Sequence, residues 1–120
     1  MAQVRYIVDD VETAAAFYTK HLGFSVRQKF PAIAILAKDD LTLWLAGPTA
    51  SASRPMPDGA KPQPGGWNRF VVTVDDLEAT VARLKAEGVQ FRNDTVVGPG
   101  CRQILVLDPA GNVIELFQPG

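Results

Sequence analysis

The sequence predicts an α+β fold in which one βαβββ module occurs twice. Residues 7–13 (IVDDVET) recur in similar form as residues 73–79 (TVDDLEA), with the VDD triplet and the glutamate identical, so the chain contains an internal repeat. After each copy, a helical apolar pattern and three β-rich segments follow in the same order. A segment rich in proline and glycine separates the copies. We expect a single domain over 1–120, with a first module at 1–46, a linker at 47–66 and a second module at 67–120.

The first module begins with an alternating, β-rich segment at residues 3–8, which predicts a half-buried strand. Asp9 is expected to cap the following helix, with Glu12 completing a capping box. Apolar residues then recur at helical spacing up to Leu22, and Gly23 is expected to end the helix. Three strands are expected after it, at 24–29, 32–38 and 41–46, with a turn at Asp39-Asp40 between the last two.

The second module repeats this order, starting from an expected strand at 68–74. Asp75 and Glu78 form the second predicted capping pair, and Gly88 is the expected end of the helix. The remaining strands are expected at 89–93, 102–107 and 112–117, with a turn at 108–111.

The linker contains Met56 as its only large apolar side chain, so it cannot bury enough surface to fold by itself. We favour an extended connector between the modules. The alternative is a lid or an arm that wraps a partner.

Charge and cysteine content exclude several classes of protein. The net charge of -1 and the dispersed basic residues give no field that attracts nucleic acid. No apolar run approaches the length of a membrane span. Cys101 is the only cysteine, which excludes an intrachain disulfide and suits a reducing cytoplasm. We therefore expect a cytoplasmic protein without nucleic-acid or membrane partners.

Two motifs resemble those of a known superfamily. Val8-x-Asp10 followed by Phe17-Tyr18 and residues 22–24 (LGF) resembles the opening of the glyoxalase, bleomycin-resistance and extradiol-dioxygenase (vicinal oxygen chelate) superfamily. Residues 108–116 (DPAGNVIEL) resemble its closing motif. The resemblance implies that the modules form a cup-shaped mixed sheet, with helices outside and the ligand inside. It also implies a homodimer, in which modules pair either within one chain or between two.

Enzymes of this superfamily hold a divalent metal with side chains from the first and last strands of each module. The matching positions are Gln3, Leu43, Arg69 and Glu115. A guanidinium has no free lone pair and leucine has no donor atom, so only Gln3 and Glu115 could bind a metal. That is fewer than the usual three or four protein ligands, so we expect no metal and no other cofactor. His21, the only imidazole, falls late in the first helix and is not expected to be a ligand.

Strand alternation separates the two faces of each strand, and the resemblance, which places the metal-ligand positions inside the cup, implies which face lines it. Gln3, Arg5 and Ile7 are expected to point inward, as are alternate residues of the other opening and closing strands, including Leu41 and Leu45. Trp44 is expected to face the helix layer, where core packing is favoured over stacking on a ligand. The predicted ligand-binding residues are Gln3, Arg5, Ile7, Phe30, Leu43, Trp44, Trp67, Arg69, Val71, Glu115 and Phe117.

Within this set, Arg69 and Glu115 are predicted to form an ion pair at the former metal position, because an unpaired charge in an apolar cup is costly. The pair either holds ligand or only holds the structure together. Trp67 and Phe30 are expected at the rim, or, for Trp67, at a subunit contact.

The favoured function is metal-free binding of a hydrophobic or aromatic small molecule, as in the antibiotic-resistance branch of the superfamily. The first alternative is an enzyme of the glyoxalase type, a lyase, isomerase or dioxygenase. It would use a shifted set of metal ligands, or Glu115 as a base with Arg69 as oxyanion partner. A further alternative is a binder of a common metabolite.

Overall fold

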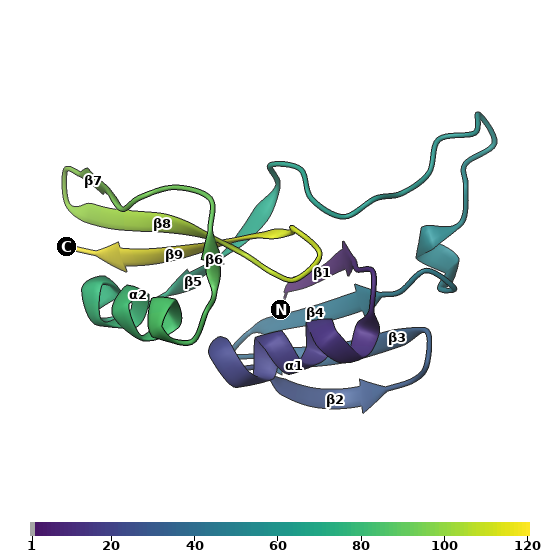
Figure 1. Cartoon of the computed structure of the whole chain (residues 1–120), viewed down its shortest axis with the longest axis horizontal. Helices are drawn as coiled ribbons and strands as arrows, with labels where there is room; N and C mark the ends of the chain where they lie inside the picture. Colours follow the sequence, from purple (N-terminus) through teal and green to yellow (C-terminus); the bar gives the residue numbers. More distant parts are fainter. Residues whose placement is uncertain (1) are drawn as a thin grey trace. The chain divides into compact units, whose positions relative to one another are not determined.

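The computed structural model describes residues 2–120 and shows an α+β fold with two βαβββ-like modules, each built on a mixed sheet (Figure 1). The chain divides into two compact units. Unit 1 contains Met1–Gly65 and the turn Pro109–Asn112, and unit 2 contains Gly66–Asp108 and Val113–Gly120. None of the helices in the described part of the chain is long and apolar enough to cross a membrane.

Unit 1 has one helix on a four-stranded sheet with strand order β1-β4-β3-β2. Strands β1 and β4 are parallel, and the other neighbours are antiparallel. The expected order of elements is confirmed. The elements are β1 (Ala2–Ile7), α1 (Val11–His21), β2 (Ser25–Lys29), β3 (Ile33–Lys38) and β4 (Leu41–Ala46).

Helix α1 is capped by Asp10, whose carboxylate accepts a hydrogen bond from the Thr13 N–H at 3.2 Å. The prediction of Asp9 as the cap is therefore wrong by one residue. Asp10 has the extended backbone of an N-cap (φ -143°, ψ 117°). The carboxylate of Glu12 forms a salt bridge with Lys29 of β2, with 3.0 Å between Oε2 and Nζ. Gly23 ends the helix as predicted, with a positive φ of 75°.

The core of unit 1 lies between α1 and one face of the sheet. Tyr18 of α1 and the side chains of Leu43 and Leu45 are fully buried. The Tyr18 ring packs edge-on against Phe24, with 5.4 Å between centroids. Burial of each such side chain stabilises the fold by roughly 1.5–3 kcal/mol.

Unit 2 repeats this plan with one additional strand. Its sheet has the order β5-β9-β8-β6, and the extra strand β7 pairs with β8. Strand β7 was not predicted, because three residues are too few to show an alternating pattern. The elements are β5 (Arg69–Thr73), α2 (Leu77–Ala86), β6 (Gln90–Phe91), β7 (Val96–Gly98), β8 (Cys101–Leu107) and β9 (Val113–Pro119).

Helix α2 is capped by Asp76, which accepts a hydrogen bond from the Ala79 N–H at 3.1 Å. The predicted cap Asp75 is again one residue early. The helix ends before Gly88, as expected, where φ is 82°. Leu77 and Leu84 of α2 are fully buried.

Between β4 and β5 the chain is irregular, apart from the short 3-10 helix η1 (Ser51–Ser53). The end of this irregular segment is held by Asn112, whose Oδ1 accepts a hydrogen bond from the Gly65 N–H at 2.8 Å. The Nδ2 of Asn112 donates to the Ile7 carbonyl at 2.7 Å. This buried asparagine thus fastens the end of β1 and the end of the linker to the Pro109–Asn112 turn within unit 1.

Candidate functional site

The pairing of β1 with β4 determines which side chains share a face in unit 1. Arg5 pairs with Trp44, and Tyr6 pairs with Leu45. Paired residues of neighbouring strands point to the same side of a sheet. Tyr6 and Leu45 are both buried on the α1 side, so Arg5 and Trp44 lie on the opposite face.

This register corrects two predicted orientations. Leu43, expected to line the cup, pairs with Val4 and is completely buried on the α1 side, and Leu41 and Leu45 share that parity. Trp44, expected to face the helix, lies on the face of Arg5. Apart from Thr42, residues 41–46 (LTLWLA) are apolar at both parities, so their alternation could not identify the helix side.

We call the face of the unit 1 sheet opposite α1 its open face. Three residues of the predicted ligand-binding set come together there. The indole Nε1 of Trp44 donates a hydrogen bond to Gln3 Oε1 at 2.9 Å. The Cζ atom of Arg5 lies 4.8 Å from the centre of the Trp44 ring, which is a cation–π contact. We call Gln3, Arg5 and Trp44 the Trp44 cluster.

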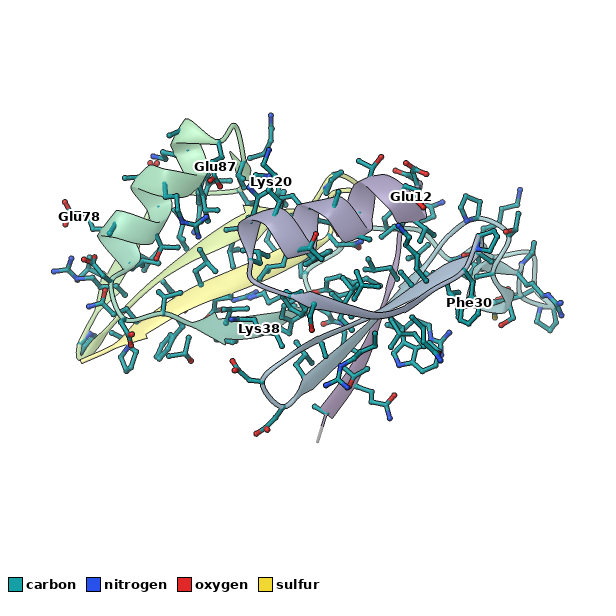
Figure 2. The ribbon with its side chains drawn as sticks, turned by 90° about the horizontal axis from the view of Figure 1, so that it is seen from below. Glu12, Lys20, Phe30, Lys38, Glu78 and Glu87 are labelled. Carbon is teal, nitrogen blue, oxygen red and sulfur yellow. The ribbon has the colours of Figure 1, made fainter. Side chains whose placement is uncertain are left out.

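The Trp44 cluster has apolar neighbours on the same face. Ile35 of β3 pairs with Trp44, and Ile33 shares its parity; both are half-buried. Ile7, another predicted residue, is also half-buried on this face. Phe30, predicted at the rim, lies in the turn between β2 and β3 and is 50% exposed (Figure 2).

In unit 2, the predicted ion pair between Arg69 and Glu115 is confirmed. Arg69 Nε donates a hydrogen bond to Glu115 Oε1 at 3.0 Å, and Arg69 Nη2 lies 3.0 Å from the same oxygen in an ion pair. Its Nη1 also donates to the carbonyl of Trp67 at 3.3 Å. The other carboxylate oxygen, Oε2, has no hydrogen-bond partner among residues 2–120, yet it is not sealed from solvent.

The other predicted residues of unit 2 surround this pair. Val71 is paired with Glu115 in the sheet and is 51% exposed, and Phe117 shares the face and is half-buried. Trp67 is 68% exposed, and Arg92 Cζ lies 3.8 Å from its ring centre. Arg92 was not predicted, because no motif or periodicity distinguishes it in the sequence.

The repeat identifies equivalent positions of the two modules. Val71 pairs with Glu115, and Arg5, the counterpart of Val71, pairs with Trp44. Trp44, rather than the predicted Leu43, therefore corresponds to Glu115. An indole offers a donor and no lone pair for a metal, so the residues at these positions do not fit a metal centre. In the described chain, no three His, Cys, Asp or Glu side chains gather closely enough to hold one.

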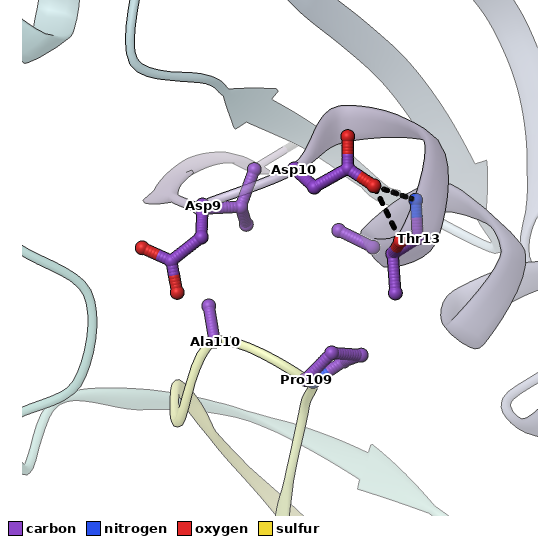
Figure 3. A pocket seen from close by; sticks show the side chains of 7 residues that line it. Asp9, Asp10, Thr13, Pro109 and Ala110 are labelled. Atoms are coloured by element: carbon purple, nitrogen blue, oxygen red, sulfur yellow. Dashed lines mark hydrogen bonds between the residues drawn. The ribbon is translucent and has the colours of Figure 1, made fainter.

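A cavity of about 110 Å³ lies at the start of α1 in unit 1 (Figure 3). Asp9, Asp10 and Thr13 line it together with Pro109 and Ala110. The Thr13 hydroxyl, which donates to the Asp10 carboxylate, and the Thr13 N–H lower the pKa of Asp10. The acid is thus engaged in capping, and the cavity is smaller than typical ligand pockets of about 300–1,000 Å³.

A second cavity, of about 300 Å³, lies in unit 2 beside α2. Glu78 and Arg102 line it with apolar residues of α2 and β7. Arg102 pairs with Gln118, whose side chain accepts a hydrogen bond from the Leu77 N–H of α2. The cavity is therefore on the helix side of the sheet, opposite the Arg69–Glu115 pair.

Comparison with known proteins places the chain among proteins of similar fold. It is 29% identical to TnmS3, an antibiotic binding protein from Streptomyces sp. CB03234, with a TM-score of 0.75 over 98% of this chain and 93% of that one. A superfamily member from Sphaerobacter thermophilus DSM 20745 is 25% identical, with a TM-score of 0.77 over 98% and 95% of the two chains.

Lactoylglutathione lyase from Agrobacterium tumefaciens, at 22% identity and a TM-score of 0.76 over 98% and 92% of the two chains, shares the fold. No match was found among curated proteins. The family model described as Glyoxalase/Bleomycin resistance protein/Dioxygenase superfamily matches residues 1–116. With both modules and both motifs included in that match, the chain belongs to this superfamily.

Proposed function

We propose that this protein binds a hydrophobic or aromatic small molecule and does not transform it. The observation that carries this proposal is the Trp44 cluster, in which a half-buried indole is fixed on an open sheet face by Gln3. A tryptophan held in one orientation offers a large contact area at little entropic cost. Ile33, Ile35 and Ile7 extend the apolar surface around it.

Two further observations support binding over chemistry. Arg69 and Trp44 occupy positions where enzymes of the superfamily place metal ligands, and neither side chain can bind a metal. TnmS3, which is 29% identical over nearly the whole chain, is an antibiotic binding protein. We propose that unit 2 also binds ligand, through the Arg69–Glu115 pair and its neighbours Val71 and Phe117, with Trp67 at the rim of that surface. In unit 1, Phe30 is proposed at the rim of the surface around Trp44.

The test is a titration that reports both binding and the fate of the compound. Trp44 and Trp67 are the only tryptophans, so Trp67→Phe leaves Trp44 as the single indole fluorophore. Bleomycin and a set of aromatic antibiotics are titrated into this variant. The bound compound is then recovered, and mass spectrometry determines whether its mass has changed. We expect quenching that saturates at one equivalent per chain, with the compound unchanged. Product that accumulates beyond one equivalent would overturn the proposal.

Glu115 supports a second candidate function, which is cofactor-free catalysis. Its Oε2 is free to accept a proton while Oε1 is held by Arg69, whose guanidinium could stabilise an oxyanion. Under this alternative, Glu115→Gln abolishes turnover and retains ligand binding. Elemental analysis of the purified protein tests the metal-dependent form, which requires stoichiometric Fe, Mn, Ni or Zn.

We also propose that the protein acts as a cytoplasmic homodimer. Native mass spectrometry of protein from its own host tests this assembly, because it reports subunit number, bound metal and bound ligand together. A mass of one chain would contradict the proposed dimer.

A further inference from the structure

We infer that the ligand is an aromatic carboxylate, and that Arg5 recognises its charge. This inference rests on the proposed function, and it adds the chemical class of the ligand. It comes from the charges on the open face of unit 1 and from the unused donors of Arg5.

Arg5 is a cation without a counter-charge. Side chains on the open face come from the four paired strands β1, β4, β3 and β2, and none of them is acidic. Arg5 makes no ion pair with any residue in 2–120. In unit 2 the situation is reversed, because Glu115 neutralises Arg69 at 3.0 Å. On the open face of unit 1, Arg5 thus offers a positive charge that no side chain in the described part of the protein neutralises.

The contact between Arg5 and Trp44 leaves the guanidinium donors available. Its Cζ atom lies over the indole at 4.8 Å, and none of its N–H groups has a hydrogen-bond partner in the described chain. A guanidinium presents its donors as a planar fork that matches the two oxygens of a carboxylate. Trp44 is itself held by Gln3, so the ring and the charge beside it form a preorganised pair.

The apolar surroundings define the rest of the ligand. Ile33 and Ile35 flank Trp44 and present no donors or acceptors from their side chains. A flat aromatic ring can cover this surface while its carboxylate reaches Arg5 at the edge. A neutral aromatic compound of the same shape would keep the ring contacts and lose the charge-assisted hydrogen bonds.

The experiment compares two probes of nearly identical shape, 2-naphthoate and 2-naphthamide, by isothermal titration calorimetry at neutral pH and low salt. We expect wild-type protein to bind 2-naphthoate about tenfold more tightly than 2-naphthamide. Arg5→Gln is expected to remove this preference, so that the variant binds the two probes with equal affinity. Arg54→Gln is the matched control, because it removes the same charge from the linker and should keep the preference.

Each outcome has a distinct meaning. Equal affinity of wild-type protein for both probes overturns the inference and leaves the proposed binding function intact. A preference that survives in Arg5→Gln overturns the role of Arg5. Failure of both probes to bind wild-type protein counts against the proposed function itself. Circular dichroism of Arg5→Gln verifies that the variant is folded, and Arg5→Lys should restore part of the preference because it restores the charge.

Discussion

Two ion pairs of unit 2 differ in how far they are removed from water. The Glu115 side chain is 10% exposed beneath Arg69, whereas Glu87, at one end of α2, is 33% exposed beside Arg83 (Figure 2). A carboxylate withdrawn from solvent loses much of its hydration and depends on its partner. An exposed pair within a helix contributes little.

Arg69→Leu is therefore expected to lower the free energy of unfolding by about 2 kcal/mol, because it strands a largely buried carboxylate. Arg83→Leu removes the exposed pair and should cost only about 0.5 kcal/mol or less. Urea denaturation of both variants measures the difference. Equal losses would show that Arg69 does not stabilise Glu115.

At this scale, the sequence could predict the Arg69–Glu115 pair because both residues match metal-ligand positions of the superfamily, and an unpaired charge there would be costly. It could not orient Trp44, since Leu43 and Trp44 are both large and apolar and the register of β4 against β1 decides between them. Tertiary structure alone brings Arg92 to Trp67, so no local sequence pattern predicts this contact.

Among the elements, both helices begin after a pair of aspartates, and in each pair the second residue is the cap. Asp76→Ala should lower the free energy of unfolding by about 1 kcal/mol, because the Ala79 N–H loses its acceptor. Asp75→Ala is the matched control and should have little effect. A larger loss for the Asp75 variant would contradict the assignment of the cap.

The cap of α1 should make stability depend on pH. Hydrogen bonds from Thr13 lower the pKa of Asp10 below its ordinary value of 3.8, so the folded state favours the ionised carboxylate. This stabilisation is present above the unfolded-state pKa and is lost as the pH falls through the lower folded-state pKa. Asp10→Asn keeps a capping oxygen that does not titrate. The difference in urea midpoint between wild type and Asp10→Asn should therefore shrink from about pH 7 to about pH 3. A constant difference would contradict this prediction.

The order of helices and strands was predictable because apolar periodicity and the glycines after each helix act locally. The exact cap was not, since Asp9 and Asp10 are chemically identical and the backbone geometry selects one of them. Strand β7 exists through its pairing with β8, which is a tertiary effect.

For the whole molecule, the Pro109–Asn112 turn has a role that the repeat does not reveal. The sequence predicts a turn here, and this is confirmed. Its hydrogen bonds to Ile7 and Gly65 join residues far apart in the sequence, and no pattern in the chain encodes them.

Asn112→Ala is expected to lower the free energy of unfolding by about 2 kcal/mol, because it leaves the Ile7 carbonyl and the Gly65 N–H without their partner. Asn93→Ala is a control of the same chemistry, because exposed Asn93 accepts one hydrogen bond, from the Leu105 N–H at 2.9 Å. Thermal unfolding compares the two variants. A similar loss in both would indicate that the asparagine of the turn has no special role.

The double attachment of Asn112 also limits how this polypeptide can be divided. A gene cut between the two repeats would yield an N-terminal fragment that ends near Gly65. This fragment would lack the side-chain amide of Asn112, which bonds its Ile7 carbonyl and its Gly65 N–H. Such a fragment would need residues from the missing half to complete its hydrogen bonding. Splitting the coding sequence there should yield two pieces that recover their structure on mixing, rather than an autonomous half.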